Sequence, residues 1–383
     1  IEFRKVVSIF ETKEYLYDFG KSRAHFCHKI KVSFSFATTG TRLGCKIPSG
    51  GGSLIGIVID VEYNTIISCE NLLEAWKEFK KGKRKKKDVQ VFEMNLMQNI
   101  FSLHYDLNHK TYVHGPYKAF KISDPKPRNI HKASVRDRLL HHAIHRNLYP
   151  EFDKLFVSDS FSCRVGKGTH RALNRFRSFG YKVSKNNTRA SRILKCDIKT
   201  FFDSIDHQVL IRILQEHILD TDILWLLNQI ISSFHTQGGK GLPLGNLTSQ
   251  LLVNIYMNKF DQFVKHGLKQ KYYIRYADDF VFFDSDEIAL WEMLPLIDSF
   301  LSEELKLSLH PNKVYMKTLA SGVDFLGWVH FPDHRVLRAV TKRRVIKGLR
   351  SENENRRNSY IGLCKHGNAY KVRKCLTLAY WNK

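Results

Sequence analysis

Two strongly β-prone segments, separated by only two residues, constrain the fold of this chain more than any other feature of its sequence. They are Tyr272–Ala277 and Phe280–Phe283, and Asp278 and Asp279 lie between them. Two strands joined by so short a turn form a hairpin. The sequence therefore predicts a β-hairpin with two adjacent carboxylates at its tip.

The segments around this hairpin alternate between strand and helix. We expect a strand over Ile193–Ile198, helices from near Asp206 and over about 246–260 and 287–305, and a strand over 322–329. Earlier in the chain, apolar periodicity predicts helices from Glu70, over about 90–107 and over about 134–148, the last ended by Pro150. This order predicts an α+β fold in which an antiparallel sheet has helices packed on one face.

The adjacent pair Asp278 and Asp279 is costly to hold together unless a cation neutralises it. Asp197 lies near the end of the Ile193–Ile198 strand and adds a third carboxylate. Three carboxylates make an all-oxygen site suited to Mg²⁺, and two such ions can activate a 3′-hydroxyl and stabilise a leaving pyrophosphate. An isolated Asp-Asp pair is more often an ordinary turn, but the apolar flanking strands favour a metal site here.

A large positive charge points to a polyanionic partner. The 383 residues include 62 Lys and Arg against 37 Asp and Glu, a formal net charge of +25. Nucleic acid is the first candidate and an anionic membrane surface the second, although no amphipathic basic helix stands out. Seven of the eight residues in Lys80–Lys87 are basic, and this run is either a nucleic-acid contact or a solvated loop.

The composition also excludes several classes of protein. Hydrophobic residues make up 43% of the chain, enough for a sizeable core rather than a disordered basic tail. The longest aliphatic run, Leu54–Ile59, is far shorter than the roughly 20 residues that a membrane span needs. The seven cysteines form no C-x-x-C pair, so we expect reduced thiols in a cytoplasmic protein.

Four motifs, in this order along the chain, resemble those of reverse transcriptases. Asp197-Ile198-x-x-Phe201-Phe202 is similar to the first catalytic box, and Gly241–Gln250 resembles the template and nucleotide loop. Tyr276-Ala277-Asp278-Asp279 resembles the Y-x-D-D box, and Phe325–Trp328 resembles the primer-grip hairpin. The resemblance covers about residues 66–383. It implies an RNA-directed DNA polymerase, a nucleotidyltransferase shaped like a right hand with fingers, palm and helical thumb.

The resemblance also assigns roles to individual residues. It implies catalysis by Asp197, Asp278 and Asp279, and two Mg²⁺ ions, or Mn²⁺, held by these aspartates and Ile198. Nucleotide binding is assigned to Lys121, Arg128, Phe202, Leu244, Gly245 and Lys313. Template and primer contacts are assigned to Ser249, Gln250, Tyr276, Phe325, Leu326, Gly327 and Trp328.

Three of the nucleotide-binding residues have specific roles in this resemblance. Arg128 grips the triphosphate, Phe202 selects deoxynucleotides by blocking a ribose 2′-hydroxyl, and Lys313 protonates pyrophosphate. From the residues alone, Phe202 could instead be core, and Lys313 an ordinary surface lysine. Phe201 beside Phe202 would point the other way along a strand.

The same resemblance gives an expected domain organisation. Residues 66–190 would form the fingers, 191–332 the palm and 333–383 the thumb, with the primer-grip hairpin near 322–332. Residues 1–65, which contain the linker-like run Ser49–Ser53, match nothing in the family and stay unassigned.

The loop sequence indicates a subgroup of the family. Leu244 stands where most members have glutamine, and Gln250 where they have proline, which resembles the enzymes of diversity-generating retroelements. This implies errors at template adenines and an oligomeric accessory variability-determinant protein, besides the RNA template, a DNA or RNA primer and dNTPs. Retron, phage-defence and group II intron-like enzymes are the alternatives. A catalytically inactive RNA-binding scaffold is the non-enzyme alternative, which the presence of all three aspartates opposes.

Overall fold

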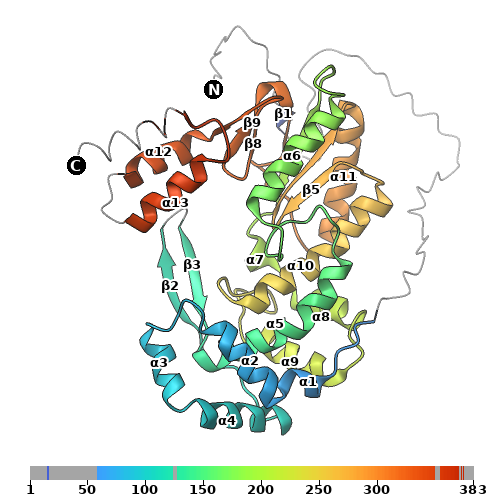
Figure 1. Ribbon diagram of the computed structural model, residues 1–383. Helices are drawn as coiled ribbons and strands as arrows, with labels where there is room; N and C mark the ends of the chain where they lie inside the picture. Colours follow the sequence, from blue (N-terminus) through green and yellow to red (C-terminus); the bar gives the residue numbers. More distant parts are fainter. Residues whose placement is uncertain are drawn as a thin grey trace, which may run out of the picture.

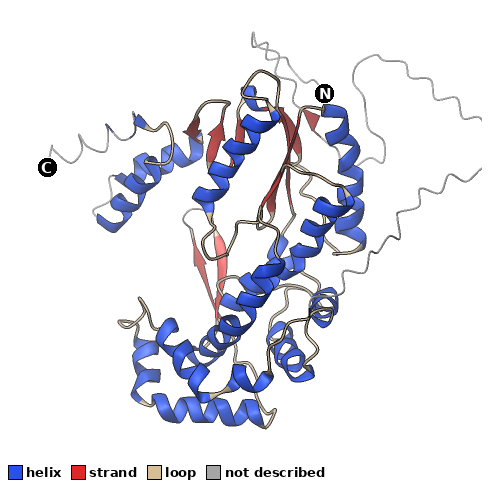
Figure 2. Ribbon diagram, turned by 45° about the vertical axis from the view of Figure 1, so that its right-hand side comes forward, coloured by secondary structure: helices blue, strands red, loops and turns tan. Residues whose placement is uncertain are grey.

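The computed structural model describes residues 15–16, 58–123, 127–349, 354–370, 372 and 374. Figures 1 and 2 show three groups of elements: a block of helices from the first half of the chain, a sheet flanked by long helices, and a smaller C-terminal group. None of the described helices is both long and apolar enough to cross a membrane.

The helical block is built from consecutive amphipathic helices. It contains α1 (Tyr63–Ile67), α2 (Cys69–Phe79), α3 (Lys87–Met94), α4 (Leu96–Asn108) and α5 (Val135–Leu155). Two helices from later in the chain share its core, α8 (His207–Gln215) and α9 (Thr221–Ser232). Ser68 begins α2, because its hydroxyl accepts a hydrogen bond from the Asn71 N–H and so satisfies a free donor of the first turn. The boundary expected after residue 65 falls inside α1, where Tyr63 and Ile66 are both buried.

Two helices differ from the expectation based on sequence. The helix expected over 90–107 is two helices, because Asn95 takes a non-helical conformation (φ −118°, ψ 41°) between α3 and α4. The helix expected to end at Pro150 continues to Leu155. An interior proline costs about 3 kcal/mol. Burial of Leu148 and Phe152 on either side offsets this cost.

Four strands from the second half of the chain and β1, from near its start, form a five-stranded antiparallel sheet with the order β1-β7-β4-β6-β5. Its strands are β1 (Tyr15–Leu16), β4 (Arg192–Asp197), β5 (Tyr273–Tyr276), β6 (Asp279–Asp284) and β7 (Tyr315–Thr318). β5 and β6 form the expected hairpin, but its turn residues are Ala277 and Asp278. The prediction that both carboxylates lie in the turn was wrong by one residue, because Asp279 belongs to β6. Ala277 adopts φ +58°, so the chain turns one residue earlier.

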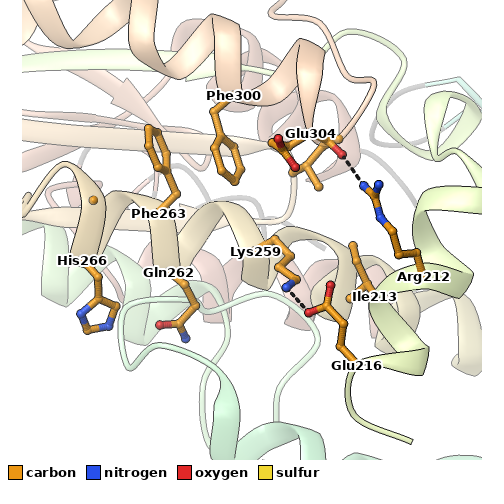
Figure 3. A pocket seen from close by; sticks show the side chains of 11 residues that line it. Arg212, Ile213, Glu216, Lys259, Gln262, Phe263, His266, Phe300 and Glu304 are labelled. Carbon is orange, nitrogen blue, oxygen red and sulfur yellow. Dashed lines mark hydrogen bonds and ion pairs between the residues drawn. The ribbon is translucent and has the colours of Figure 1, made fainter. Parts of the chain in front are cut away.

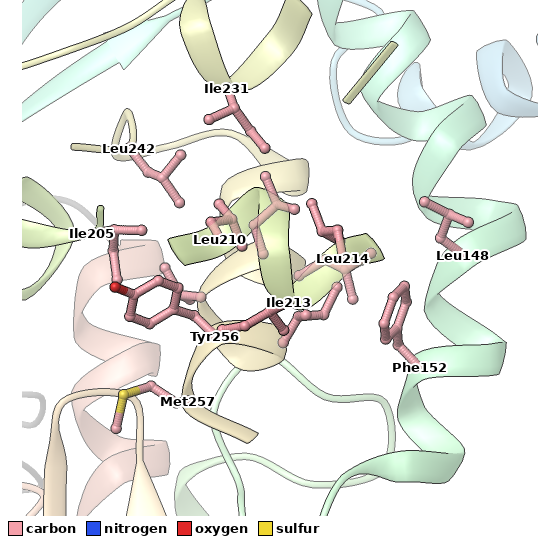
Figure 4. Close-up of a cluster of buried hydrophobic side chains, with 14 of the residues drawn as sticks. Leu148, Phe152, Ile205, Leu210, Ile213, Leu214, Ile231, Leu242, Tyr256 and Met257 are labelled. Carbon is pink, nitrogen blue, oxygen red and sulfur yellow. The ribbon is translucent and has the colours of Figure 1, made fainter. Parts of the chain in front are cut away.

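Side chains alternate between the two faces of this sheet and build two hydrophobic cores. The first core lies between one face and α8, α10 (Leu247–Gln262) and α11 (Glu287–Glu303), and it continues into the helical block. Figure 4 shows part of this core, with side chains from α5, α8 and α10. The second core lies between the other face and α6 (Thr169–Val183). The α+β fold class is thus confirmed, with α6 as an additional helix on the second face.

The C-terminal group packs on the second core. β8 (Val323–Phe325), β9 (Trp328–His330) and β10 (Arg335–Leu337) form an antiparallel sheet, followed by α12 (Ala339–Leu349) and α13 (Glu354–Cys364). A Cβ at Gly348 would overlap the Tyr360 ring, and one at Gly367 would overlap Trp328, so both close approaches need glycine. The strand expected over 322–329 is the β8–β9 hairpin, whose two turn residues both have positive φ.

Candidate active site

Three aspartates meet at one end of the two central strands. Asp197 ends β4 and pairs with Asp279 at the start of β6, and Asp278 precedes it in the hairpin turn. The Ile198 N–H donates to the Asp278 carbonyl oxygen (3.1 Å) and so fixes the turn against the end of β4. The structure therefore brings together all four residues predicted for the metal site.

Two lysines are paired with these carboxylates. Lys313 Nζ lies 2.7 Å from Asp197 Oδ1, and Lys195 Nζ lies 3.2 Å from Asp279 Oδ2. Lys195 also donates to the Asp324 carbonyl oxygen (2.9 Å), so it connects β4 to β8. In the described part of the chain, Asp279 Oδ1 is buried without a hydrogen-bond partner.

The pKa values of two aspartates show that negative charge is poorly compensated here. Burial raises the pKa of Asp279 to about 6, although Lys195 opposes the rise. Burial and the neighbouring Asp197 raise the pKa of Asp278, while Lys313 and Arg128 oppose it. Carboxylates whose charged form is destabilised in this way gain from a bound cation.

The donor set fits a divalent cation that prefers oxygen ligands. Among the residues that the structure describes, no three His, Cys, Asp or Glu side chains enclose an ion position as they stand. The unpartnered oxygen of Asp279 and the raised pKa values nevertheless mark a place where positive charge is missing. Carboxylate oxygens are the ligands that Mg²⁺ prefers, so Asp197, Asp278 and Asp279 suit that ion.

A two-stranded hairpin from the helical block is bonded to the loop that precedes α10. It consists of β2 (Lys118–Ile122) and β3 (Arg128–Lys132). The His131 N–H donates to the Leu244 carbonyl oxygen (3.0 Å), and the Asn246 amide donates to the His131 carbonyl oxygen (3.0 Å). Gly245 has φ +106°, and a Cβ there would lie 2.8 Å from Ile130, so a side chain would separate the loop from β3.

Arg128 and Lys121 point to opposite faces of this hairpin. Arg128 pairs with Ile122, and Lys121 pairs with Asn129. Cross-strand partners share a face, whereas neighbours along a strand alternate. On its own face of the hairpin, Arg128 carries a positive charge that lowers the pKa of Asp278. The structure does not bring Lys121 to that face, and the hairpin tip at 124–126 lies outside the described residues.

Phe201 and Phe202 lie on a short helix, so the expectation that they point to opposite sides of a strand was wrong. Thr200 has φ +44°, which ends the extended segment after β4 and starts α7 (Phe201–Ser204). Phe201 is buried in the first core, whereas Phe202 is only partly buried. The two rings still divide into one core residue and one that a nucleotide could reach. The Phe202 carbonyl oxygen accepts from the Leu242 N–H (2.8 Å), which holds the loop before α10 beside α7.

The predicted template and primer residues divide into buried and accessible ones. Ser249 is buried within α10. Phe325 and Trp328 belong to the second core, so their side chains support the β8–β9 hairpin from beneath. The partly exposed members of the set are Gln250, Tyr276, Leu326 and Gly327.

Two buried charges beside the aspartates were missed in the sequence. Lys195 precedes Asp197 by two residues and therefore shares its sheet face. Arg275 in β5 has no exposed surface and pairs with Asp261 of α10 at 2.7 Å. The signal that could have found Arg275 is a single charge inside an otherwise apolar strand, because such a residue needs a partner when buried. The signal for Lys195 is a cation two residues before Asp197, on the same face of the strand.

A hollow of about 420 Å³ lies away from the aspartates, between α8, α10, the π-helix η1 (Phe263–Gly267) and α11. In Figure 3, the stacked rings of Phe263 and Phe300, with centroids 4.2 Å apart, face the Lys259–Glu216 ion pair. None of the predicted site residues lines this hollow, so it is not the candidate active site.

Residues 121–330 match a family model described as "Reverse transcriptase (RNA-dependent DNA polymerase)". This span is more than half of the chain and contains every residue of the candidate site. The chain belongs to the reverse transcriptase family.

Several known proteins are similar to this reverse transcriptase over part of their length. Protein YkfC of Escherichia coli is 25% identical over 255 residues, which cover 56% of this chain and 65% of that protein. The group II intron-encoded protein LtrA of Lactococcus lactis subsp. cremoris is 26% identical over 185 residues, covering 46% and 29%. The chain thus spans less than two thirds of either relative. A solved structure of apo telomerase from Candida tropicalis, truncated from its C-terminal domain, has a TM-score of 0.44 and 14% identity, covering 63% of this chain and 60% of that one.

Proposed function

We propose that this reverse transcriptase is an RNA-directed DNA polymerase that copies an RNA template into cDNA. The observation that carries the proposal is the meeting of Asp197, Asp278 and Asp279 at the end of the central strands. The charge of Arg128 also acts on Asp278, because it lowers the pKa of that carboxyl. Mg²⁺, or Mn²⁺, held by the aspartates and Ile198 would supply Lewis-acid stabilisation of the primer 3′-oxygen and the leaving pyrophosphate. An inactive scaffold has no support, because the three carboxylates are all present and adjacent.

The chain's own side chains would orient the nucleotide. Arg128 offers a guanidinium fork suited to triphosphate oxygens. Phe202 would exclude a ribose 2′-hydroxyl, and Lys313, 2.7 Å from Asp197, would pass a proton to pyrophosphate. In this proposal the fingers begin with α1 (Tyr63–Ile67) and end near residue 190, residues 191–332 are the palm and 333–383 the thumb.

Primer extension tests the proposal. With a poly-A RNA template, a DNA primer, dTTP and Mg²⁺, we expect a cDNA ladder that disappears when the divalent cation is chelated. Absence of extension with either Mg²⁺ or Mn²⁺, while RNA is still bound, would favour the RNA-binding scaffold.

The basic run Lys80–Lys87 gives a prediction about template binding. Two of its lysines are bonded to other parts of the protein, since Lys83 donates to the Phe79 carbonyl oxygen and Lys80 pairs with Glu93. Its other basic residues, Lys81, Arg84, Lys85, Lys86 and Lys87, are exposed. Changing Lys81, Lys85 and Lys86 to serine should make the slope of log affinity against log salt shallower by about 0.7 for each phosphate that the variant no longer neutralises. Fluorescence anisotropy with labelled RNA measures this slope.

The matched control removes three exposed lysines elsewhere. Lys269, Lys271 and Lys306, changed to serine together, alter the net charge equally but lie at the ends of η1 and α11. We expect a slope close to that of the unmodified chain. Equal slopes for both triple variants would show that Lys80–Lys87 is a solvated loop.

The finer proposal is that the enzyme serves a diversity-generating retroelement, with frequent misincorporation opposite template adenine. Its support is Leu244, which can offer the incoming nucleotide only van der Waals contact from its side chain, and Gln250, which stands where most members of the family have proline. An oligomeric accessory protein and native RNA would be the partners. Retron, phage-defence or group II intron-like activity remains the alternative outcome.

Leu244→Gln should reduce errors opposite adenine. A restored hydrogen bond near the sugar contributes about 0.5–1.5 kcal/mol, roughly a three- to tenfold gain for a well-aligned pair. Leu244→Met, which stays apolar at similar volume, is the matched control and should keep the errors. Sequencing of cDNA from one RNA template compares the three enzymes. Low, base-independent error in the unmodified enzyme with its accessory protein would place it in the retron, defence or intron group.

A further inference from the structure

Arg275 carries a buried guanidinium in which all five N–H groups have an acceptor. Nε and Nη2 donate to the two carboxylate oxygens of Asp261 (2.8 and 2.7 Å). Nη2 also donates to Ser160 Oγ (3.0 Å), and Nη1 donates to Asn254 Oδ1 (3.3 Å) and the Ala277 carbonyl oxygen (3.2 Å). One side chain thus joins α10, the loop before α6 and the turn that carries Asp278.

The bond to Ala277 bears on the direction of Asp278. Ala277 has φ +58°, in the left-handed region that alanine rarely adopts. A residue in this conformation persists only where its surroundings hold it. The Arg275 guanidinium holds the carbonyl of the peptide that links Ala277 to Asp278, so it fixes the point from which the Asp278 side chain leaves.

The backbone of Arg275 fixes the loop at residues 159–162 in the same way. Its N–H donates to the Asp159 carbonyl oxygen (3.0 Å), and its carbonyl oxygen accepts from the Phe161 N–H (3.0 Å). Asn254, which accepts from the guanidinium, also donates to the Ser162 carbonyl oxygen (3.0 Å). The loop, the turn and α10 therefore share one buried centre.

We infer that Arg275, held by Asp261, is the positioning residue that sets the direction of the Asp278 carboxylate for catalysis. The inference rests on the proposed polymerase function, and Arg275 acts through Asp278 rather than on the nucleotide. Lysine could not replace it, because three donors on one nitrogen cannot reach acceptors on α10, the loop and the turn together.

Paired substitutions separate positioning from stability. Arg275→Met alone leaves Asp261 buried and unpaired, and we expect it to melt well below the unmodified chain. Adding Asp261→Leu removes both charges, and the double variant should recover most of the melting temperature. If Arg275 positions Asp278, kcat of the double variant stays at least tenfold low while its RNA affinity stays within twofold. Arg275→Lys keeps a positively charged partner for Asp261, and its kcat should fall to a similar extent. This variant replaces the double variant in the test if the double variant does not fold.

Tyr273→Phe is the matched control. The Tyr273 hydroxyl donates to the same Asp261 (2.7 Å) from the same strand, but it lies outside the bonds to Ala277 and to residues 159–162. We expect kcat within twofold of the unmodified chain. If Tyr273→Phe lowers kcat as much as Arg275→Lys does, the network acts only through general stability and the inference fails.

Hydrogen exchange supplies a readout that does not need activity. The amides of Ile198 and Phe161 report on the turn and the loop, because they donate to the Asp278 and Arg275 carbonyl oxygens. We expect at least tenfold faster exchange at both in the Arg275 variants, with unchanged exchange at Leu194 in the middle of β4. Unmodified kcat and exchange in a folded variant would overturn the inference. An inactive unmodified chain whose exchange responds as expected would refute the polymerase function but not the positioning of Asp278.

Discussion

Replacing Asp278 by asparagine is expected to lower the rate of cDNA synthesis by about 10³-fold or more, because groups that act as a unit fail together. The substitution preserves shape and removes one charge from the set formed with Asp197 and Asp279, which are adjacent across β4 and β6. Affinity for template RNA should stay unchanged, since the basic residues that bind phosphate are untouched. Steady-state primer extension and RNA binding on one preparation measure both effects.

Asp333→Asn is the control for this substitution. Asp333 is an exposed aspartate in the turn before β10, where it pairs with His334, so the same chemical change is made far from the three aspartates in sequence. We expect its extension rate within twofold of the unmodified chain. Extension by Asp278→Asn at a tenth of the unmodified rate or more would remove Asp278 from the metal site.

Acidification from pH 7 to pH 5 is expected to lower the free energy of unfolding by about 2 kcal/mol for each of two buried histidines. Burial lowers the pKa of His141 to about 3, with a further contribution from His114, and burial lowers the pKa of His330 to about 3. The unfolded chain titrates near pH 6.5, so it binds these protons first as the pH falls. Stability that is complete above about pH 6.5 is therefore lost progressively toward pH 3.

Asp279 acts in the opposite direction over part of this range. Its pKa is raised to about 6, so the folded chain takes up this proton before the unfolded chain does and regains about 1 kcal/mol between pH 7 and pH 5. The net change for the three groups is still a loss. Urea denaturation at pH 7 and pH 5 measures it.

His330→Phe should remove one histidine's share of this pH dependence, about 2 kcal/mol. His330 already packs against the Phe176 ring, with centroids 4.2 Å apart, so an aromatic replacement suits the site. His334→Phe, at an exposed position four residues further on, is the control and should leave the pH dependence unchanged. Identical pH dependence in both variants would show that burial of His330 does not couple stability to protonation.

Much of the sheet and its helices was predictable because local patterns determine them. The β5–β6 hairpin, β4, α10 and α11 follow apolar alternation or helical spacing that the sequence displays directly. The continuation of α5 through Pro150 was not predictable, since it depends on burial of Leu148 and Phe152 by distant residues. The one-residue shift of the hairpin turn has a similar origin, because Ala277 is held in its conformation by Arg275.

The candidate site was predictable in its residue types and less so in its geometry. Family-like spacing singled out the aspartates, and the structure places them together. Which face Arg128 and Lys121 occupy depends on the pairing register of β2 and β3, which sequence spacing across the tip does not specify. The burial of Trp328 depends on Gly367, almost forty residues away in the chain, so local pattern could not reveal it.

The second core supports the β8–β9 hairpin from beneath and makes it rigid. Phe325 stacks on Phe176 of α6, with ring centroids 5.2 Å apart, and Trp328 is covered by Gly367. The partly exposed turn at Leu326 and Gly327 therefore rests on side chains that close packing makes nearly incompressible. In the proposed polymerase, we therefore expect this turn to keep its position when a primer–template duplex binds beside it.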